Sequence, residues 1–600
     1  MKAPAFRTAV LFALIVFFLS ANRVSAQVPL EPAQMPARTL FYFIWRGAPS
    51  PGVRQTNAVM ALWDDPGFAP ARSALARSLL GNSEEKNSQL QLSQEELDEY
   101  SALLDNPFVL GYLGEPQKHA NGSKPTPPEA NAPDAQFPGT KAPLWNGIFF
   151  VYDRTGKEAI LAKAIVRLRA QEKDPPQISE IVVGKVHALK VARKTGITYW
   201  AEHGKYALSA SERPVLEELL SRLNANSPAT PSLAQSPAYQ EAKPFLGNSL
   251  LEFFVRVPSL KEFAPDPTAA GLRLRPLLDA AKLDDVHSFS GRLTLEGTKT
   301  HLQGAMFGNA APGTIFDIWS AGQPAPASLA FVPADTVSYN ATYLNFQGIY
   351  EVMKRILRST FPPGQQQNAD MIDSVLQVRL GVPLPDALTS LNGEFASFQT
   401  SPSMDSTRQI FFLGVRKKPE ILKLIRNLAG DRIKSERDAG DTTFLKISLG
   451  GSQAGAGLAQ WNFYHFAVTP TAILAASRLE TLNELLARRA QDSSASSLAA
   501  VRQFETARSQ FPEKLNGLSY FDFQKIDWPA LRDRWTPSAP KISASAALSG
   551  SQRASQQPSA PQVPNWLSQV DPQVFPRHLH LTYSASWKDA RGIHFEQWIE

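Results

Sequence analysis

The sequence contains no cysteine among its 600 residues, and this absence excludes several classes of protein at once. Without thiols the chain can form no disulfide, no thiolate metal site and no cysteine nucleophile. It also lacks the cysteine to which a lipoprotein attaches its lipid. The fold must therefore be stabilised by hydrophobic cores, and this length predicts about two to four domains.

Dense basic clusters and long apolar runs are also missing. The net charge is +6, and no run of Lys and Arg is dense enough to predict a nucleic-acid partner. The basic residues of 408–434 fall on an expected helix, and we interpret them as its solvated face. Beyond the N-terminus no stretch approaches the roughly 20 apolar residues that a membrane-spanning helix needs.

The N-terminus has the pattern of a secretory signal. Lys2 and Arg7 precede the apolar run 9–21, and Val24-Ser25-Ala26 is a small-residue cleavage site. Cleavage after Ala26 would remove three positive charges and reduce the net charge to +3. We therefore expect residues 1–26 to be a signal peptide and the protein to be periplasmic or extracellular. The alternative is an uncleaved N-terminal anchor, in which case the protein would be held at the membrane.

A stretch of about 28 residues occurs twice, at 196–223 and 460–488. Each copy predicts an aromatic strand, a turn, a short apolar strand and an amphipathic helix with a serine at its start. We expect these serines to cap the helices. The matching residues are Ser211, Leu216, Glu218, Leu219 and Leu220 in the first copy and Ser477, Leu482, Glu484, Leu485 and Leu486 in the second.

Other elements recur in the same order around this stretch. Pro36, Ala37 and Thr39 open an expected strand in the first half, and Pro333, Ala334 and Thr336 do so in the second. The chain is therefore predicted to hold two similar α+β repeats, 27–325 and 326–600, with mainly antiparallel sheets and helices packed on them. Pro-rich tracts at 115–143 and 537–564 are interpreted as insertions.

The Pro-Ala-x-Thr strand opening, the strand–turn–Ser–helix unit and the segments that begin at Ser232 and Ser496 resemble the DUF3352-type family of exported bacterial proteins. This resemblance covers most of the chain after residue 26. It implies an envelope or secreted location and a repeated α+β fold. The family has no established activity, so the resemblance implies no catalytic residue. The Pro-rich insertions depart from the family pattern.

Two motifs are similar to those of penicillin-recognising serine enzymes. Ser83 and Lys86 match S-x-x-K, and 194–196 matches K-T-G, but S-D-N is absent and the first segment is polar. We interpret both as solvated loops or strand edges. The glycine-rich run 450–457 lacks the lysine and the following helix of a phosphate-binding loop, so we interpret it as a hairpin loop.

The nine histidines give one weak metal pattern. His578 and His580 would share one face of an expected strand at 578–587, and His594 would lie on its partner strand. Three imidazoles could hold zinc, but no fourth ligand is evident and a structural role is favoured. His203 and His465 are expected at similar places in the two repeats, also with structural roles. The acid pairs 64–65 and 284–285 are interpreted as turns.

These observations predict an exported cell-envelope protein with a non-catalytic binding or structural role. No catalytic, metal or cofactor residue is assigned. An envelope protein or a small ligand could bind in a cleft between the repeats, since domain interfaces often hold ligands. The alternative is a secreted hydrolase whose site is assembled from distant loops, in which Ser83, Lys86 and Lys194 would converge. A third reading, a membrane-anchored scaffold, requires an uncleaved N-terminus.

Overall fold

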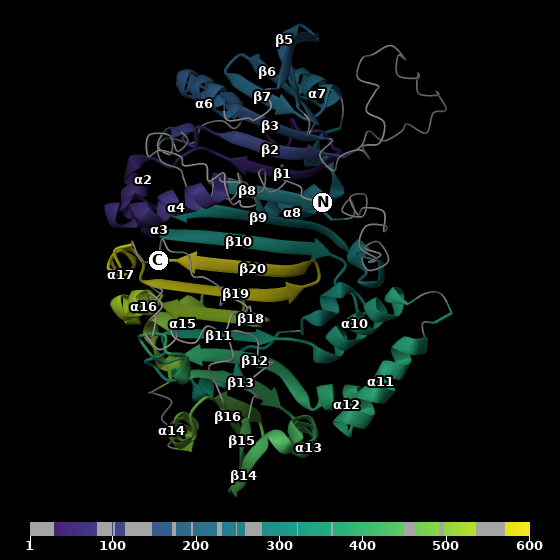
Figure 1. Cartoon of the computed structure of the whole chain (residues 1–600), viewed down its shortest axis with the longest axis vertical. Helices are drawn as coiled ribbons and strands as arrows, with labels where there is room; N and C mark the ends of the chain where they lie inside the picture. Colours follow the sequence, from purple (N-terminus) through teal and green to yellow (C-terminus); the bar gives the residue numbers. More distant parts are fainter. Residues whose placement is uncertain are drawn as a thin grey trace, which may run out of the picture. The chain divides into compact units, whose positions relative to one another are not determined.

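The structure is a computed structural model, shown in Figure 1. It describes residues 29–80, 99, 102–114, 147–170, 176–193, 196–224, 231–247, 249–257, 279–320, 322–361, 364–365, 367–448, 463–490, 497–535 and 570–600. These residues form two compact units, which we describe separately. The first unit draws on 1–55, 72–264 and 287–295, and the second on 56–71, 265–286 and 296–600.

The first unit is built on an antiparallel sheet. In its described residues the strands pair in the order β9, β8, β1, β2, β3, β7, β6, β5, β4. Strand β1 has a partner on each side, and six of its seven residues are buried, so it is one of the inner strands of the sheet. The strands are β1 (Thr39–Trp45), β2 (Phe108–Leu113), β3 (Ile148–Asp153), β4 (Gln177–Val183), β5 (Val186–Arg193), β6 (Gly196–His203), β7 (Tyr206–Ala210), β8 (Leu251–Arg256) and β9 (Val286–Glu296).

The second unit is also built on an antiparallel sheet. Its described strands pair in the order β10, β20, β19, β18, β11, β12, β13, β17, β16, β15, β14. Here β11 lies between β12 and β18. The strands are β10 (Lys299–Gly308), β11 (Ser338–Tyr343), β12 (Leu391–Gln399), β13 (Gln409–Val415), β14 (Ile433–Ala439), β15 (Thr442–Ser448), β16 (Phe463–Val468), β17 (Ala472–Ala476), β18 (Gly517–Asp522), β19 (Leu581–Asp589) and β20 (Gly592–Ile599).

The two units connect their strands in the same way. Strands β1 to β9 pair in the same order as β11 to β19. Even an isolated bridge recurs, between Pro36 and Ser232 in the first unit and between Pro333 and Ser497 in the second. Residues at matching places in this order are called equivalent below. The origin of the two units in a duplication, and a repeat boundary between 325 and 326, stay predictions.

Helix α7 packs on the sheet of the first unit through the leucines that the sequence pattern places on one face. Val215, Leu216 and Leu219 are at most 1% exposed, as expected for the apolar stripe of an amphipathic helix. The helices of this unit are α6 (Glu158–Ala170), α7 (Arg213–Asn224), α8 (Pro237–Ala242) and the 3₁₀ turns η3 (Leu233–Gln235) and η4 (Lys243–Phe245). Helices α2 (Pro51–Thr56) and α4 (Ala69–Leu80) run across the division of the chain into units.

The helices of the second unit cover both faces of its sheet. Leu474 of β17 packs in the same cluster as α14, whereas the adjacent Ile473 packs with α13; successive strand residues point to opposite faces. The helices are α3 (Ala58–Asp64), α10 (Phe346–Thr360), α11 (Gln367–Leu380), α12 (Leu384–Thr389), α13 (Lys418–Ala429), α14 (Leu479–Ala490), α15 (Arg502–Arg508), α16 (Trp528–Trp535) and α17 (Val574–His578). The 3₁₀ turns are η1 (Pro66–Phe68), η7 (Leu283–Asp285), η8 (Ile315–Ile318), η9 (Ala327–Phe331), η10 (Ser406–Arg408), η11 (Gly430–Arg432), η13 (Leu498–Ala500) and η14 (Phe523–Lys525).

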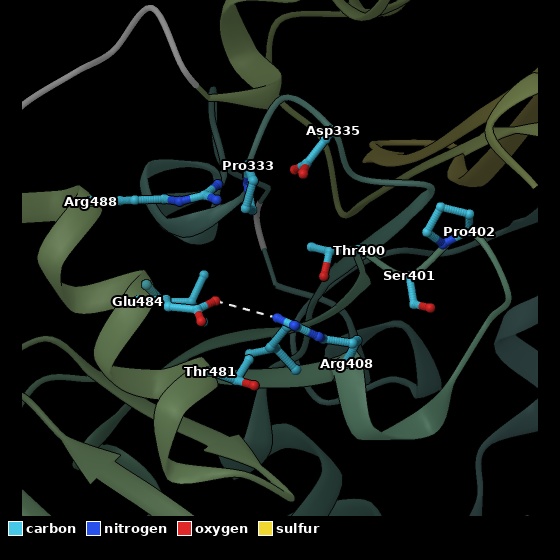
Figure 2. A pocket seen from close by; sticks show the side chains of 11 residues that line it. Pro333, Asp335, Thr400, Ser401, Pro402, Arg408, Thr481, Glu484 and Arg488 are labelled. Carbon is cyan, nitrogen blue, oxygen red and sulfur yellow. Dashed lines mark hydrogen bonds and ion pairs between the residues drawn. The ribbon is translucent and has the colours of Figure 1, made fainter.

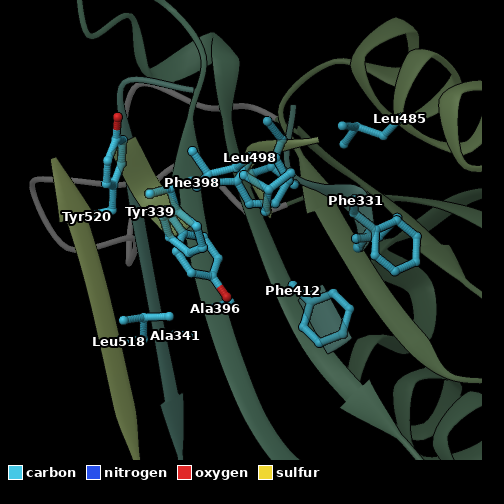
Figure 3. Packing of buried hydrophobic residues seen from close by; sticks show 14 of the residues in the cluster. Phe331, Tyr339, Ala341, Ala396, Phe398, Phe412, Leu485, Leu498, Leu518 and Tyr520 are labelled. Atoms are coloured by element: carbon cyan, nitrogen blue, oxygen red, sulfur yellow. The ribbon is translucent and has the colours of Figure 1, made fainter. Parts of the chain in front are cut away.

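The core of the second unit lies between its central strands and α14, η13 and α15. Figure 3 shows rings from β11, β12, β13 and β18 together with Leu485 and Leu498. The largest of these side chains, including Tyr339, Phe398 and Phe412, are at most 2% exposed. The pocket described below opens beside this core and shares Leu485 with it.

The predicted α+β class with mainly antiparallel sheets is confirmed. Within 177–193 the apolar run is divided into two strands, because Gly184 has φ +62° and turns the chain into the hairpin of β4 and β5. Strand β14 was not expected, because all its residues but one are exposed and its pattern is polar. No helix in the described ranges is long and apolar enough to cross a membrane.

The expected helix caps are wrong. Helices α7 and α14 begin at Arg213 and Leu479, two residues after Ser211 and Ser477. The Ser211 hydroxyl accepts a hydrogen bond from the N–H of Gly147 at 2.9 Å, and the Ser477 hydroxyl donates to the Thr407 carbonyl at 3.2 Å. Each serine therefore ties the helix to the chain that leads into the neighbouring strand, β3 or β13.

Candidate functional site

A pocket of about 310 Å³ lies in the second unit. Figure 2 shows its polar side chains around a common space. Four short segments form its wall: the turn before β11, the loop after β12, the start of β13 and one face of α14. The lining residues are Pro333, Asp335, Thr400, Ser401, Pro402, Arg408, Ile410, Thr481, Glu484, Leu485 and Arg488.

Helix α14 supplies four lining residues because of their spacing. Thr481, Glu484, Leu485 and Arg488 follow one another at intervals of three, one and three, which places them on one face of a helix. Leu485 is 4% exposed and Thr481 is 5% exposed, so this edge of the face is anchored in the core. Glu484 and Arg488 are exposed and extend their charged groups to the pocket.

The turn before β11 holds Asp335 at the opposite wall. Pro333 bridges to Ser497, and the N–H of Thr336 donates to the Pro333 carbonyl at 3.1 Å. Thr336 is fully buried, whereas Asp335 is exposed. The turn is therefore fixed on both sides, and its aspartate carboxylate faces the pocket in Figure 2.

The charges of the pocket are two guanidinium groups and two carboxylates. Arg408 Nη1 lies 3.3 Å from Glu484 Oε2, and both side chains are about half exposed (45% and 56%). An ion pair so open to solvent contributes little to stability, roughly 0–1 kcal/mol. Among the described residues, neither Asp335 nor Arg488 lies in an ion pair. These two groups can therefore bind a ligand without breaking an existing contact.

The remaining wall is divided between hydroxyl groups and apolar surface. Thr400, Ser401 and Thr481 contribute hydroxyls, and the Ser401 and Ser403 hydroxyl oxygens lie 3.0 Å apart. None of the eleven lining residues is a histidine, lysine, cysteine or tyrosine. The wall therefore offers serine and threonine hydroxyls beside two carboxylates and two guanidinium groups.

The equivalent place in the first unit is closed by its own side chains. Arg38, at the place of Asp335, donates to Glu218 Oε2 through Nη2 at 2.8 Å and to the Gly114 carbonyl. Arg222, at the place of Arg488, donates to Glu218 Oε1 at 3.2 Å and to the Gln34 carbonyl at 3.2 Å. Arg222 is only 5% exposed. One carboxylate thus accepts two guanidinium groups, one on each oxygen.

Three substitutions distinguish the two places; in one of them Gly147, which leads into β3, is replaced by Arg408, whose guanidinium contacts Glu484. Arg38 is replaced by Asp335, which is too short to reach across and has the opposite charge. Val215 of α7, 1% exposed, is replaced by Thr481, which adds a hydroxyl to the wall. The second unit keeps the carboxylate, as Glu484, and the second arginine, as Arg488. Its Glu484 contacts the Arg408 guanidinium, from the chain before β13, in place of the guanidinium that Arg38 supplies in the first unit.

The residues matched between the two halves of the sequence include residues of this site, but the match alone did not identify them as a site. The Pro-Ala-x-Thr openings differ at their third position, which is Arg38 in one half and Asp335 in the other. Glu218 and Glu484 were matched, but as parts of a scaffold. The charge is reversed at one matched position, from Arg38 to Asp335, while Glu218 and Glu484 are matched as well. These two features together could have indicated the pocket from the sequence.

The expected placement of His578 and His580 on one face of a strand is wrong. The strand expected at 578–587 begins only at Leu581, because the N–H of Leu579 closes a helical turn on the Phe575 carbonyl. His578 ends helix α17, His580 is exposed in the connection, and His594 is buried on β20, 3.0 Å from Asp589 Oδ1. No group of His, Asp and Glu suited to a metal ion occurs in the described ranges.

His203 and His465 are not equivalent, contrary to the expectation. His465 pairs with Ala476 across β16 and β17, and the residue that pairs with the matching Ala210 is Tyr199. Burial and the nearby Lys446 ammonium lower the pKa of His465, which keeps this ring neutral. The other candidates, Ser83, Lys86, Lys194 and the run 450–457, lie outside the described residues.

Asp65 is the centre of a second polar cluster. Its Oδ2 lies 2.7 Å from Arg577 Nη1 and 2.8 Å from His578 Nε2, and its Oδ1 accepts from the N–H of Gly67. Burial alone would raise the pKa of Asp65, but these hydrogen bonds outweigh it and lower the pKa to about 2. The side chain is 9% exposed. The cluster joins the turn at η1 to α17, and we interpret it as structural. The turn expected at Asp65 is present.

The two equivalent arginines should differ in their contribution to stability. Arg222→Ala removes a buried guanidinium with three hydrogen bonds and is expected to lower the free energy of unfolding by about 2–3 kcal/mol. Arg488→Ala removes an exposed side chain and should cost less than about 0.5 kcal/mol. Urea denaturation of the ligand-free protein, followed by tryptophan fluorescence, measures both. Equal losses of unfolding free energy in Arg222→Ala and Arg488→Ala would contradict the description of the first site as closed and the second as open.

Asp65 should contribute to the acid sensitivity of the protein. Its pKa is about 2 in the folded state and about 3.9 in an unfolded chain. Its ionised form therefore stabilises the fold above pH 4, and this contribution is lost as the pH falls from 4 to 2. Asp65→Asn should be less stable than wild type at pH 7 and should lose less stability between pH 4 and pH 2. Urea midpoints across this range test it, with the exposed Asp431→Asn as the control that keeps the wild-type slope.

Comparisons with known proteins give a single solved structure to report. No family model and no curated protein matches the chain. The solved structure is crystal form III of TP0453, which matches 49% of this chain and 85% of its own with 9% identity and a TM-score of 0.23. A similarity of this size identifies neither a family nor a function for the chain.

Proposed function

We propose that the protein is an exported, non-catalytic binding protein of the cell envelope, and that the pocket of the second unit holds its ligand. The observation that carries the proposal is the contrast between equivalent places in the two units. Where the first unit fills the space with Arg38, the second unit has Asp335 and a pocket of about 310 Å³. Ligand sites have volumes of roughly 300–1,000 Å³, so the ligand is small.

Binding is favoured over catalysis by the groups that face the pocket. They are suited to ionic and hydrogen-bonded recognition, because two arginines, two carboxylates and three hydroxyls converge on one space. The hydrolase alternative would place Ser83, Lys86 and Lys194 together. Those residues lie outside the described ranges.

A site between the two repeats and membership of the DUF3352-type family stay predictions. The similar strand order of the two units supports a further proposal, that they arose by duplication of one α+β module. In that case one copy kept or acquired an arginine that closes its site, and the other copy retained an open pocket.

Export is proposed from the N-terminal pattern alone. Lys2, Arg7, the apolar run 9–21 and the cleavage site at Ala26 support it. When the full chain is expressed in a bacterial host, N-terminal sequencing of the exported protein should give Gln27 as its first residue. A protein that keeps Met1 in the membrane fraction would instead support the anchored alternative.

The binding proposal is tested by closing the pocket with the residue that the first unit uses. Asp335→Arg should place a guanidinium near Glu484 and abolish ligand binding with little loss of stability. Thermal denaturation against a panel of amino acids, sugars, nucleotides and organic acids provides the measurement. At 100 times its dissociation constant, a ligand stabilises the folded state by about 2.7 kcal/mol, which raises the melting temperature by several degrees.

The matched control is Asp431→Arg, which makes the same change of charge at an exposed aspartate outside the pocket. At least one compound should raise the melting temperature of the wild type and of this control but not of Asp335→Arg. A panel in which no compound acts, or in which Asp335→Arg responds as the wild type does, would refute the binding proposal.

A further inference from the structure

We infer that the ligand carries a guanidinium group and a carboxylate, as the amino acid arginine does. This inference rests on the proposed binding function and specifies the chemistry of the same pocket. We take the side-chain contacts of the closed site in the first unit as a guide to the contacts that a ligand makes in the second.

The guanidinium is assigned by the residue that the fold itself places there. In the first unit the Arg38 guanidinium contacts Glu218 and the carbonyl of Gly114, which directly follows β2. In the second unit Glu484 is kept, and Ser401, which the strand register matches with Gly114, lines the pocket. A planar cation in this position would meet the Glu484 carboxylate and the chain at Ser401.

The change from Arg38 to Asp335 strengthens the preference for a cation. The replacement removes a positive charge from the site and adds a negative one at its wall. A guanidinium in the pocket would therefore have two carboxylates, Asp335 and Glu484, within the lining. An opposite charge nearby favours a charged ligand, more so as the ligand excludes water from the pocket.

Arg408 does not exclude this cation. It contacts Glu484 through Oε2 only. In the first unit the equivalent Glu218 accepts a guanidinium on each of its two oxygens. Glu484 can likewise bind Arg408 and a ligand guanidinium at once, and Asp335 supplies the additional negative charge.

The carboxylate is assigned by Arg488. Its equivalent, Arg222, is held by Glu218 and the Gln34 carbonyl, but Arg488 forms no ion pair among the described residues and is exposed at the pocket. Its fork of donors matches a carboxylate in geometry and charge. In Figure 2 it enters from the side of α14, away from Ser401 and Pro402.

The space between the two charged ends has apolar walls. Pro333, Ile410 and Leu485 line it and could cover a chain of methylene groups. A volume of about 310 Å³ is at the small end for ligand sites. These features fit a single amino acid or the terminal residue of a peptide, and they exclude a larger cofactor.

Isothermal titration calorimetry of the full-length mature protein tests the inference with four probes. They are L-arginine, citrulline (which replaces the guanidinium by a neutral urea group), agmatine (which lacks the carboxylate) and N-acetyl-arginine (which has the two groups of a peptide's terminal arginine). L-Arginine should bind. Citrulline and agmatine should each bind roughly tenfold or more weakly, because each loses a charge-assisted contact.

Variants assign each end of the ligand to a residue. Arg488→Gln should weaken L-arginine roughly tenfold or more but leave agmatine unchanged, since agmatine has no carboxylate for it to bind. Asp335→Asn should weaken L-arginine and agmatine by similar factors. Asp431→Asn should leave every affinity at its wild-type value. Binding of N-acetyl-arginine as tight as that of L-arginine would assign the source to a peptide end, and weaker binding would assign it to the free amino acid.

The outcomes separate the inference from the proposed function. Equal affinity for citrulline and L-arginine would overturn the guanidinium assignment, and equal affinity for agmatine would overturn the carboxylate assignment. If arginine does not bind while another compound of the panel binds in a way that Asp335→Arg abolishes, the inference fails and the binding function stands. If no compound binds, both fail.

Discussion

The structure of each unit depends on a central strand that is hydrogen-bonded on both sides. Strand β1 lies between β2 and β8, and β11 lies between β12 and β18. The turn that enters each strand is held by a bridge from a proline to a serine and by a buried threonine, Thr39 or Thr336. The residue between the fixed ends of this turn is Arg38 in the first unit, where it contacts Glu218 of α7, and Asp335 in the second, where it lines the pocket with residues of α14. The chemistry of the site follows from that one position.

The two units show how little separates a closed site from an open one on the same scaffold. In the first unit a buried arginine and a partly buried one share a carboxylate, and the charges are satisfied within the chain. Buried charges need partners of this kind, since removing one leaves the other uncompensated. In the second unit the same glutamate and arginine are exposed. Solvent satisfies their charges at little cost, and they can exchange water for a ligand.

Much of this fold could be predicted from the sequence, because its signals are local. The apolar faces of α7 and α14 follow from apolar periodicity, and Leu216, Leu219, Leu482 and Leu485 are buried as expected. Strand β14 could not be predicted, since a strand exposed on both faces has no apolar pattern. The pocket could not be predicted because its wall joins four segments from 333 to 488, and only folding brings them together. The expected strand face of His578 and His580 was wrong because helix α17 ends at His578, so the two residues do not share a strand.

The ion pair of Arg38 with Glu218 has a consequence for how many ligand molecules one chain can hold. A side chain tethered in its own site is present there at an effective concentration in the millimolar range or above, so a free competitor has to exceed this level to displace it. The first site is thus already occupied by a side chain of the protein itself. Under the proposed binding function, a chain with two equivalent sites would bind with a stoichiometry of one, and its response to ligand would be a simple hyperbola without cooperativity.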